Sequence, residues 1–256
     1  MRVGLIGSGN MARALARGWG EPVLCSDSGR GSGRAEALAA ELGGRAASNV
    51  EVAQESDLVV LCHKPRQFAE VAEEIRGHAR AVASVLGSID ARSLASAYGP
   101  AQVFRLMPNT PVEVRQGVIC YSPFTGPEHP LDPDLEREVL ELFGRLGTVM
   151  LVDEHQMGVA NAVVGVGPAY QALIAEAQVD AAVRHGLPPA VAAQLVVGTM
   201  AGAAALLAVR GYDTLAVRRE VTSPGGTTAR GLAALERGGL RAAFADAIDR
   251  ALEVAG

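Results

Sequence analysis

The 256-residue sequence predicts an α/β fold, a doubly wound and mostly parallel β-sheet, followed by an all-α C-terminal dimerisation domain. Short apolar runs alternate with helical patterns over the first three fifths of the chain, which is typical of successive βα units. A glycine-rich turn joins the first strand to the first helix, and from residue 153 onward only helical patterns follow. We therefore predict two domains, residues 1–153 and residues 154–256.

Composition and charge exclude several classes of protein. The formal net charge is -5 and the longest basic cluster is Arg218-Arg219, so nucleic acid is not an expected partner. No run reaches about eighteen uninterrupted apolar residues, and the apolar start is too short for a signal peptide, so no membrane association is predicted. Cys25, Cys62 and Cys120 are scattered without metal-ligand spacing. We expect a cytoplasmic protein with no metal site.

The period of the apolar residues places the individual elements. Strands are expected at residues 2–6, 22–26, 45–47, 57–62, 80–85, 102–107, 117–121 and 148–152. Helices of the second domain are expected at residues 154–185, 190–210, 214–221, 227–237 and 240–254, with a kink at Gly167-Pro168. So much small apolar surface is hard to bury within one chain, which predicts intertwining with a second subunit.

The first expected strand runs into Gly7-Ser8-Gly9-Asn10-Met11-Ala12, and a helical pattern follows at once. A strand, a Gly-x-Gly-x-x-Ala turn and a helix form the context in which this motif marks a dinucleotide site. Gly7 allows the tight turn, Gly9 lets the backbone approach a pyrophosphate, and Ala12 still permits close packing of the helix on the strand. The first domain is therefore predicted to be a Rossmann-type domain that binds NAD or NADP.

The end of the second strand bears on the choice of cofactor. Asp27, directly after Ser26, stands near the position where an acidic side chain reads the adenosine ribose and repels a 2′-phosphate. The loop that follows carries Arg30 and Arg34, which could neutralise such a phosphate. The choice between NAD and NADP stays open on these residues.

Two further turns are expected at the carboxyl edge of the sheet, where ligands bind in open α/β folds. The strand at 57–62 delivers His63-Lys64-Pro65 to this edge. Lys64 is expected to contact cofactor or substrate, whereas His63 by itself is typical of a loop residue. The strand at 102–107 leads into Pro108-Asn109-Thr110-Pro111, where two prolines stiffen a turn that holds an amide and a hydroxyl.

A second candidate site lies between two Ala/Leu-rich helices, in the stretch Val221-Thr222-Ser223-Pro224-Gly225-Gly226-Thr227-Thr228. Two adjacent glycines can point successive N–H groups into one concavity, and the helix that follows adds its unpaired N-terminal donors. A carboxylate or a phosphate suits such a concavity. The alternative is an ordinary connection between helices with a threonine cap.

Several of these segments occur in the order found in one enzyme family. They are the glycine turn, the Lys-Pro pair, Arg105-Leu106-Met107-Pro108-Asn109-Thr110-Pro111, Gly167-Pro168-Ala169-Tyr170 and the stretch 222–228. Together they resemble pyrroline-5-carboxylate reductase over essentially the whole chain. The resemblance implies an oxidoreductase of proline biosynthesis that moves a hydride from NADH or NADPH to the C=N carbon of 1-pyrroline-5-carboxylate, giving L-proline. It also implies an interlocked homodimer, often assembled into a ring of dimers.

Most site residues follow from the same resemblance, and the patterns described above add Ile6, Ser26, Asp27, Asn109, Ser223 and Gly225. Lys64 and Thr228 are the expected catalytic residues. The expected substrate-binding residues are Glu154, Ser223, Gly225, Gly226, Thr227 and Thr228. The expected cofactor-binding residues are Ile6, Gly7, Ser8, Gly9, Asn10, Met11, Ser26, Asp27, Asn49, His63, Lys64, Pro65 and Asn109. The substrate carboxylate would accept hydrogen bonds from the N–H groups of Gly226 and Thr227, with the Thr228 hydroxyl near the ring nitrogen.

The chain also departs from the family pattern. Val164 and Val166 stand where the family usually has serines, Asn161 stands where it has threonine, and Leu86-Gly87-Ser88 replaces Ala-Ala-Gly. These changes leave open a paralogue that reduces another cyclic imine or keto acid, and a nucleotide-sensing protein without turnover. A β-hydroxyacid dehydrogenase is disfavoured, because residues 154–209 contain no lysine to act in catalysis.

Overall fold

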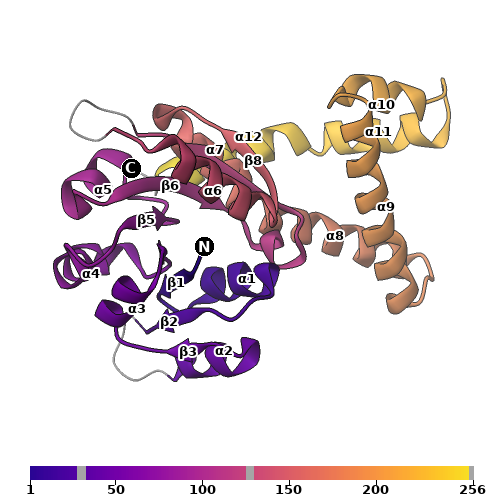
Figure 1. The fold of residues 1–256 in the computed structure, drawn as a ribbon. Helices are drawn as coiled ribbons and strands as arrows, with labels where there is room; N and C mark the ends of the chain where they lie inside the picture. The colour runs from indigo at the N-terminus through magenta and orange to yellow at the C-terminus, as the bar shows by residue number, and fades with distance from the viewer. Residues whose placement is uncertain (28–32, 125–129, 254–256) are drawn as a thin grey trace. The chain divides into compact units, whose positions relative to one another are not determined.

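The computed structural model describes residues 1–27, 33–124 and 130–253. Eight strands form a single sheet in the order β3-β2-β1-β4-β5-β6-β7-β8 (Figure 1). Neighbouring strands are parallel except at β6 and β7, which run antiparallel. The strands are β1 (Val3–Ile6), β2 (Leu24–Ser26), β3 (Arg45–Ala46), β4 (Leu58–Leu61), β5 (Ala81–Ser84), β6 (Gln102–Pro108), β7 (Gly117–Ser122) and β8 (Gly147–Leu151). The predicted α/β class and the mostly parallel sheet are confirmed.

Helices cover both faces of this sheet, and two apolar clusters form the core. One cluster joins α1, α2 and α6 to one face, and the other joins α3, α4 and α5 to the opposite face. A smaller cluster packs α7 against β6 and β7. The helices are α1 (Asn10–Trp19), α2 (Arg34–Leu42), α3 (Asn49–Glu55), α4 (Phe68–Ile75), α5 (Ala91–Tyr98), α6 (Pro133–Gly144) and α7 (Met157–Val164). Burial on both faces explains why β4 and β5 are apolar throughout.

One helix of this layer starts directly after Ser48. Asn49 is the first residue of α3. Ser48 caps this helix reciprocally: its hydroxyl accepts from the N–H of Glu51, and the Glu51 carboxylate accepts from the N–H of Ser48 at 2.8 Å. The Ser-x-x-Glu spacing of this capping box is the sequence pattern typical of a helix start.

The C-terminal helices are α8 (Gly167–Arg184), α9 (Pro189–Val209), α10 (Thr214–Glu220), α11 (Thr227–Arg237) and α12 (Leu240–Glu253). The kink expected at Gly167-Pro168 is a break two residues earlier, because α7 ends at Val164 with Gly165 as its C-cap. Arg30 and Val254, which entered the predictions above, lie outside the described residues. Internal contacts divide the chain into two compact units, one containing Met1–Pro168 and the other Ala169–Arg250. The boundary at residue 153 stays a prediction.

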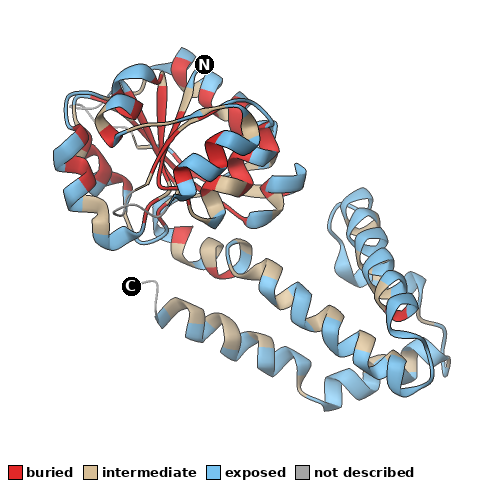
Figure 2. Cartoon of the chain, turned by 90° about the horizontal axis from the view of Figure 1, so that it is seen from below, coloured by how far each residue is buried: buried red, intermediate tan, exposed pale blue. Residues whose placement is uncertain are grey.

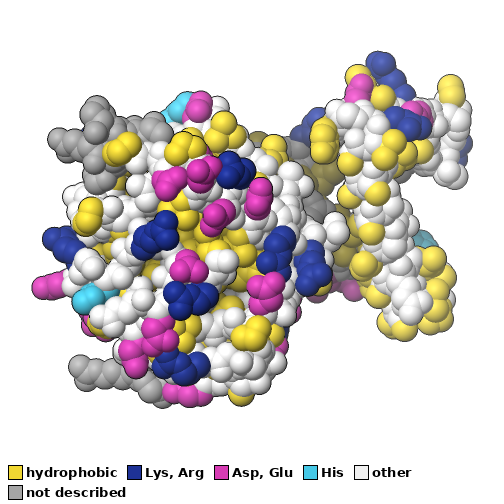
Figure 3. All heavy atoms as spheres, in the orientation of Figure 1, with side chains coloured by type: hydrophobic (Ala, Val, Ile, Leu, Met, Phe, Trp, Pro, Cys, Tyr) yellow, Lys and Arg dark blue, Asp and Glu magenta, His cyan; other side chains and the backbone are white. Residues whose placement is uncertain are grey.

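The helical unit exposes most of its apolar side chains. Figure 2 shows buried residues concentrated in the sheet and its helices, whereas α8 to α12 are largely intermediate or exposed. In Figure 3 apolar atoms are spread over these helices, and Leu173, Leu195 and Val197 are each more than half exposed. By length and composition alone, Glu154–Arg184 and Pro189–Val209 are apolar enough to cross a membrane. This surface therefore needs a covering that the single chain does not provide.

Candidate active site

The carboxyl ends of the parallel strands form one edge of the sheet, and a pocket of about 680 Å³ opens there. The chain passes from β1 to β2 on one side and returns to β4 on the other, so the edge has a topological switch point between β1 and β4. Six of the residues predicted to bind cofactor line the pocket: Ser8, Asn10, Met11, His63, Lys64 and Pro65. The turn after β5 and Thr110 after β6 complete its wall.

The two glycines of the first turn have different environments. Gly7 has φ +99°, and a Cβ built on it would lie 2.6 Å from the backbone nitrogen of His63. Gly9 has an extended backbone, and a Cβ built on it would have no heavy atom within 4 Å. Gly9 is also the N-cap of α1 and supplies no side-chain cap. The turn therefore leaves an open approach to the first N–H groups of α1, which is suited to a pyrophosphate.

Polar side chains after β2 are held by the protein itself. The Ser8 hydroxyl donates to the Asp27 carboxylate, which also accepts from the Arg34 N–H at 3.2 Å. On the neighbouring positions the Ser26 hydroxyl donates to the Asn49 amide oxygen at 2.5 Å. These contacts tie the β2 end to the glycine turn and keep a negative charge beside it.

His63 is buried at the end of β4, with 5% of its surface exposed. Its Nδ1 donates to the carbonyl oxygen of Lys64 at 2.9 Å, because a carbonyl can only accept. Burial lowers the pKa of the imidazole below its ordinary value, so the ring is neutral at pH 7. Its Nε2 has no hydrogen-bond partner among the described residues. Lys64 itself is exposed on the pocket wall.

Asn109 is placed at the same edge but already has a structural partner. Its side-chain oxygen accepts from the Val118 N–H at 2.9 Å, which holds the turn between β6 and β7. Asn109 is 9% exposed, and the pocket is lined by its neighbour Thr110 instead. Its role in cofactor binding stays a prediction.

An ion pair between a buried arginine and a partly exposed glutamate lies beside the turn that follows β5. Arg105 of β6 is 7% exposed, and its Nη1 contacts Oε1 of Glu154, the first residue of a 3-10 turn after β8. The same carboxylate oxygen accepts from the N–H of Ala91 at 3.3 Å, and Nη2 of Arg105 donates to the carbonyl of Gly87 at 3.2 Å. Gly87 in turn lines the pocket. The predicted substrate residue Glu154 thus has a fixed neighbour at the cofactor edge.

The hydroxyl and glycine loop of the helical unit forms a tight turn ahead of α11. Gly225 has φ +69°, and the Gly226 N–H donates to the carbonyl of Ser223 at 3.1 Å. Gly226 was expected to offer its N–H to the substrate, whereas here the turn uses it. Gly226 is the N-cap of α11 without a side-chain cap, and within the described ranges no hydrogen bond engages the N–H groups of Thr227 and Thr228. These exposed donors are suited to an anion.

Sequence reasoning gave no role to two of these residues. Arg13 adds a cation to the pocket lining, and Arg105 organises the ion pair with Glu154. Arg34, expected near a 2′-phosphate, lies in the same lining. The sequence does indicate a special role for Arg105, because it is a charged residue inside an otherwise apolar strand. The sequence does not indicate a role for Arg13, since an arginine on the first helix is equally typical of a solvent-exposed helix face.

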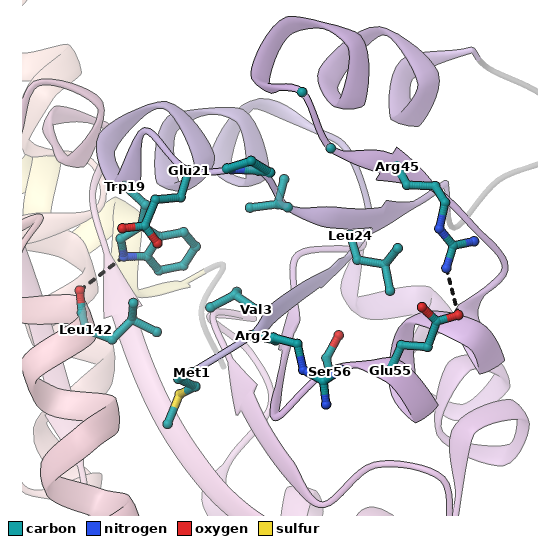
Figure 4. A pocket seen from close by; sticks show the side chains of 14 residues that line it. Met1, Arg2, Val3, Trp19, Glu21, Leu24, Arg45, Glu55, Ser56 and Leu142 are labelled. Atoms are coloured by element: carbon teal, nitrogen blue, oxygen red, sulfur yellow. Dashed lines mark hydrogen bonds and ion pairs between the residues drawn. The ribbon is translucent and has the colours of Figure 1, made fainter.

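A second pocket, of about 550 Å³, lies at the opposite edge of the sheet near the starts of β1, β2 and β3 (Figure 4). Trp19, Val3 and Leu142 form its apolar side, and the Trp19 indole N–H donates to the Leu142 carbonyl at 3.1 Å. Arg45 at the other side is paired with Glu55 at 2.7 Å. Its charged groups are thus matched by the protein, and it is remote from the residues predicted to act.

Clusters of metal-ligand side chains and the cysteine thiols are the remaining candidates for a reactive site. Over the ranges that the structure describes, no group of three or more His, Cys, Asp or Glu side chains converges on a point. Burial raises the pKa of the Cys25 thiol to about 11 and that of the Cys62 thiol to about 12, so neither is a thiolate nucleophile at neutral pH.

The fold and the pocket at the switch point define a dinucleotide-binding protein of the oxidoreductase class. Residues 2–88 match the domain described as NADP oxidoreductase, coenzyme F420-dependent, and residues 154–256 match the pyrroline-5-carboxylate reductase dimerisation domain. A pyrroline-5-carboxylate reductase of Thermus thermophilus is 32% identical, with 98% of this chain and 96% of the relative covered. One from Corynebacterium melassecola is 33% identical, with 94% and 93% covered.

Solved structures agree with these relatives. The 1-pyrroline-5-carboxylate reductase of Streptococcus pyogenes superposes with a TM-score of 0.88 at 28% identity, covering 100% of this chain and 98% of that one. The Plasmodium falciparum pyrroline carboxylate reductase with NADP bound gives 0.85 at 25% identity, covering 100% and 97%. The chain belongs to the pyrroline-5-carboxylate reductase family.

Proposed function

We propose that the protein is a pyrroline-5-carboxylate reductase that uses NADH or NADPH to reduce the C=N bond of 1-pyrroline-5-carboxylate, giving L-proline. The observation that carries this proposal is the full-length match, 32% identical over 98% of the chain. It covers both the residues of the pocket at the sheet edge and those of the loop before α11, so the proposal does not depend on fold resemblance alone.

The residues of the pocket fit a nicotinamide dinucleotide. Gly9 leaves the space that a Cβ would fill, and the uncapped start of α1 offers N–H groups to the pyrophosphate. Asp27 and Ser8 stand where the adenosine ribose would lie, and Lys64 adds a positive charge at the wall. When bound, the cofactor supplies the hydride. Val85, Leu86 and Gly87 would line the rest of the cofactor site.

The substrate is an anion with a basic ring nitrogen, and each part has a candidate partner. The open N–H groups of Thr227 and Thr228 bind the carboxylate, and the Thr228 hydroxyl hydrogen-bonds the ring nitrogen. The Glu154 carboxylate holds the protonated nitrogen. Because an iminium accepts hydride more readily than a neutral imine, the protein needs to position the ring and keep the proton in place rather than supply a strong acid.

A homodimer completes the proposal. The C-terminal half matches a dimerisation domain, and the exposed apolar side chains of α8 and α9 need a partner surface. We infer an interlocked dimer, with further assembly into a ring of dimers, and location in the cytoplasm without nucleic acid or membrane partners. Burial of the apolar helices in such a dimer accounts for their length and hydropathy.

Steady-state kinetics with NADH and NADPH on 1-pyrroline-5-carboxylate test the proposal. Substrate-dependent oxidation of either cofactor is expected, with strong loss in Thr228→Ala and in Gly226→Val, where the built Cβ would lie 2.4 Å from Oγ of Ser223. Normal turnover of both variants would remove the loop from the site.

Asn161, Val164 and Val166 motivate a second candidate, a paralogue that reduces another cyclic imine or keto acid. A panel of such compounds separates the two, because the paralogue would turn over another compound with a much higher kcat/KM. Cofactor binding with no turnover on any member would indicate a nucleotide-sensing protein.

A further inference from the structure

Arg105 is a buried charge inside the sheet. It lies in the middle of β6, opposite Ser84 at the end of β5, and 7% of its surface is exposed. Because side chains alternate along a strand, Arg105 shares a face with Val103 and Met107, whose clusters include α5 and α7 respectively. Arg105 therefore lies between two buried apolar residues of its strand face, where a cation is costly unless a carboxylate and hydrogen-bond acceptors surround it.

The partners of Arg105 connect the wall of the predicted cofactor pocket to the predicted substrate carboxylate. Nη1 contacts Oε1 of Glu154, and Nη2 donates to the Gly87 carbonyl at 3.2 Å. Gly87 belongs to the wall of the cofactor pocket, and Glu154 is the predicted substrate carboxylate. One rigid, planar group thus links the pocket wall to the carboxylate, a geometry that the single ammonium of lysine reproduces only in part.

The ion pair also orients the carboxylate. Arg105 and the N–H of Ala91, at 3.3 Å, both engage Oε1 of Glu154, and Ala91 is the first residue of α5. Among the residues that the structure describes, none hydrogen-bonds Oε2 of Glu154, whose side chain is 40% exposed. The buried side of the carboxylate is therefore fixed and its other side is open to a ligand.

We propose that Arg105 is a positioning residue, which holds Glu154 at a set distance from Gly87 in the wall of the predicted cofactor pocket, so that an iminium nitrogen bound by Glu154 lies beside that pocket. This inference rests on the proposed function. Arg105 does not touch the substrate in this scheme and acts only through Glu154.

The experiment compares Arg105→Met, Arg105→Lys, Glu154→Gln and the double variant Arg105→Met with Glu154→Gln. Arg145→Met is the matched control, because Arg145 also pairs with a carboxylate, Glu21 at 2.6 Å, and donates to a carbonyl, that of Trp19 at 3.3 Å. That pair lies at the opposite edge, where Trp19 and Glu21 line the other pocket. Each variant is assayed for kcat and KM on the imine, and for NADH and NADPH affinity by fluorescence titration without substrate.

We expect Arg105→Met to lower kcat about tenfold and to raise the KM for the imine, with cofactor Kd within about twofold of the wild-type value. Arg105→Lys should recover part of kcat, and Arg145→Met should match the wild type. The double variant should be no worse in kcat/KM than Glu154→Gln alone, because Arg105 acts through Glu154.

Three results would overturn the proposal: additive losses in the double variant, no recovery with lysine, or an equal loss in Arg145→Met. If the wild-type protein fails to reduce the imine, the proposed function itself is wrong. The positioning role is then judged by carboxyl NMR of Glu154, whose signal should sharpen to one environment in the wild type and broaden in Arg105→Met. Identical Glu154 carboxyl signals in the wild type and Arg105→Met would rule out the positioning role of Arg105.

Discussion

A side chain on Gly7 would place its Cβ 2.6 Å from the backbone nitrogen of His63, so the turn after β1 and the turn after β4 are in direct backbone contact. Neither backbone can retreat, because β1 and β4 are paired neighbours in the sheet from Val3 opposite Leu58 to Ile6 opposite Leu61. Gly9, two residues further on, has no such neighbour. The two glycines of one motif therefore serve different purposes.

Gly7→Ala and Gly9→Ala should separate fold from cofactor binding. Gly7→Ala combines φ +99° with the backbone overlap, and we expect the free energy of unfolding to fall by at least about 2 kcal/mol. Gly9→Ala should change it by no more than about 0.5 kcal/mol and still weaken NAD(P)H binding about tenfold or more. Urea unfolding and fluorescence titration measure the two effects. Unaltered cofactor binding in Gly9→Ala would place the pyrophosphate elsewhere.

Asp27 should oppose a 2′-phosphate. Its carboxylate stands beside Ser8 of the glycine turn, so Asp27→Asn removes a like charge from the ribose site while keeping the shape. We expect the ratio of kcat/KM for NADPH to that for NADH to rise about tenfold over the wild-type ratio. Asp57→Asn, which alters a carboxylate bound to the N–H of Arg2 at 2.7 Å, is the control and should leave the ratio unchanged. A ratio in Asp27→Asn equal to that of the wild type would mean that Arg13 and Arg34, rather than Asp27, set the cofactor preference.

His63 should make stability depend on pH. Burial lowers its pKa in the folded state below the ordinary value of 6.5, so the unfolded chain binds a proton first as the pH falls. The stability contributed by the neutral ring is therefore present above pH 6.5 and is lost below it, by up to about 1.4 kcal/mol at pH 5.5. Urea unfolding without cofactor at pH 7.5 and 5.5 measures the loss, which should be smaller in His63→Phe. Parallel losses in both proteins would show that His63 is protonated equally easily in the folded state.

Breaking the Arg105 and Glu154 pair should have unequal effects on stability. Glu154→Gln leaves a guanidinium buried without a carboxylate, and we expect a cost of about 3 kcal/mol in the free energy of unfolding. Arg105→Met leaves a carboxylate that is 40% exposed and can be solvated, so its cost should be smaller. Thermal unfolding of both variants checks the order, and the reverse order would contradict the burial assigned to the pair.

The exposed face of the C-terminal helices should mediate self-association. Leu195 on α9 is 55% exposed, and a charge at this position would be buried if α9 packs against a second copy. We expect sedimentation to show a dimer for the wild type and mostly monomer for Leu195→Glu at micromolar concentration. Val114→Glu, at a residue 69% exposed in the sheet unit, is the control and should remain dimeric. A dimeric Leu195→Glu protein would place the interface on another face.

Much of the site was readable from local pattern. The predicted strands place Gly7, Asp27 and Lys64 at one edge because parallel strands share their carboxyl ends, and the structure confirms that placement. The loop at 222–228 was predicted to offer N–H donors to a ligand. One donor differs from that prediction, because the Gly226 N–H is used within the turn. That hydrogen bond depends on the backbone dihedral angles of Gly225 and Gly226, which the amino-acid composition of the loop does not specify.

What the amino-acid sequence determined by itself was the order of elements, the glycine turn and the likeness to one family, because each depends on residues adjacent in the chain. Only the tertiary structure decided that Arg105 of β6 meets Glu154 of a turn beyond β8, and that both adjoin the pocket wall at Gly87. Those residues are far apart in sequence and come together because the strands pair laterally and α5 and α7 pack on one face. A buried charge selects its partner through that packing, which no local pattern encodes.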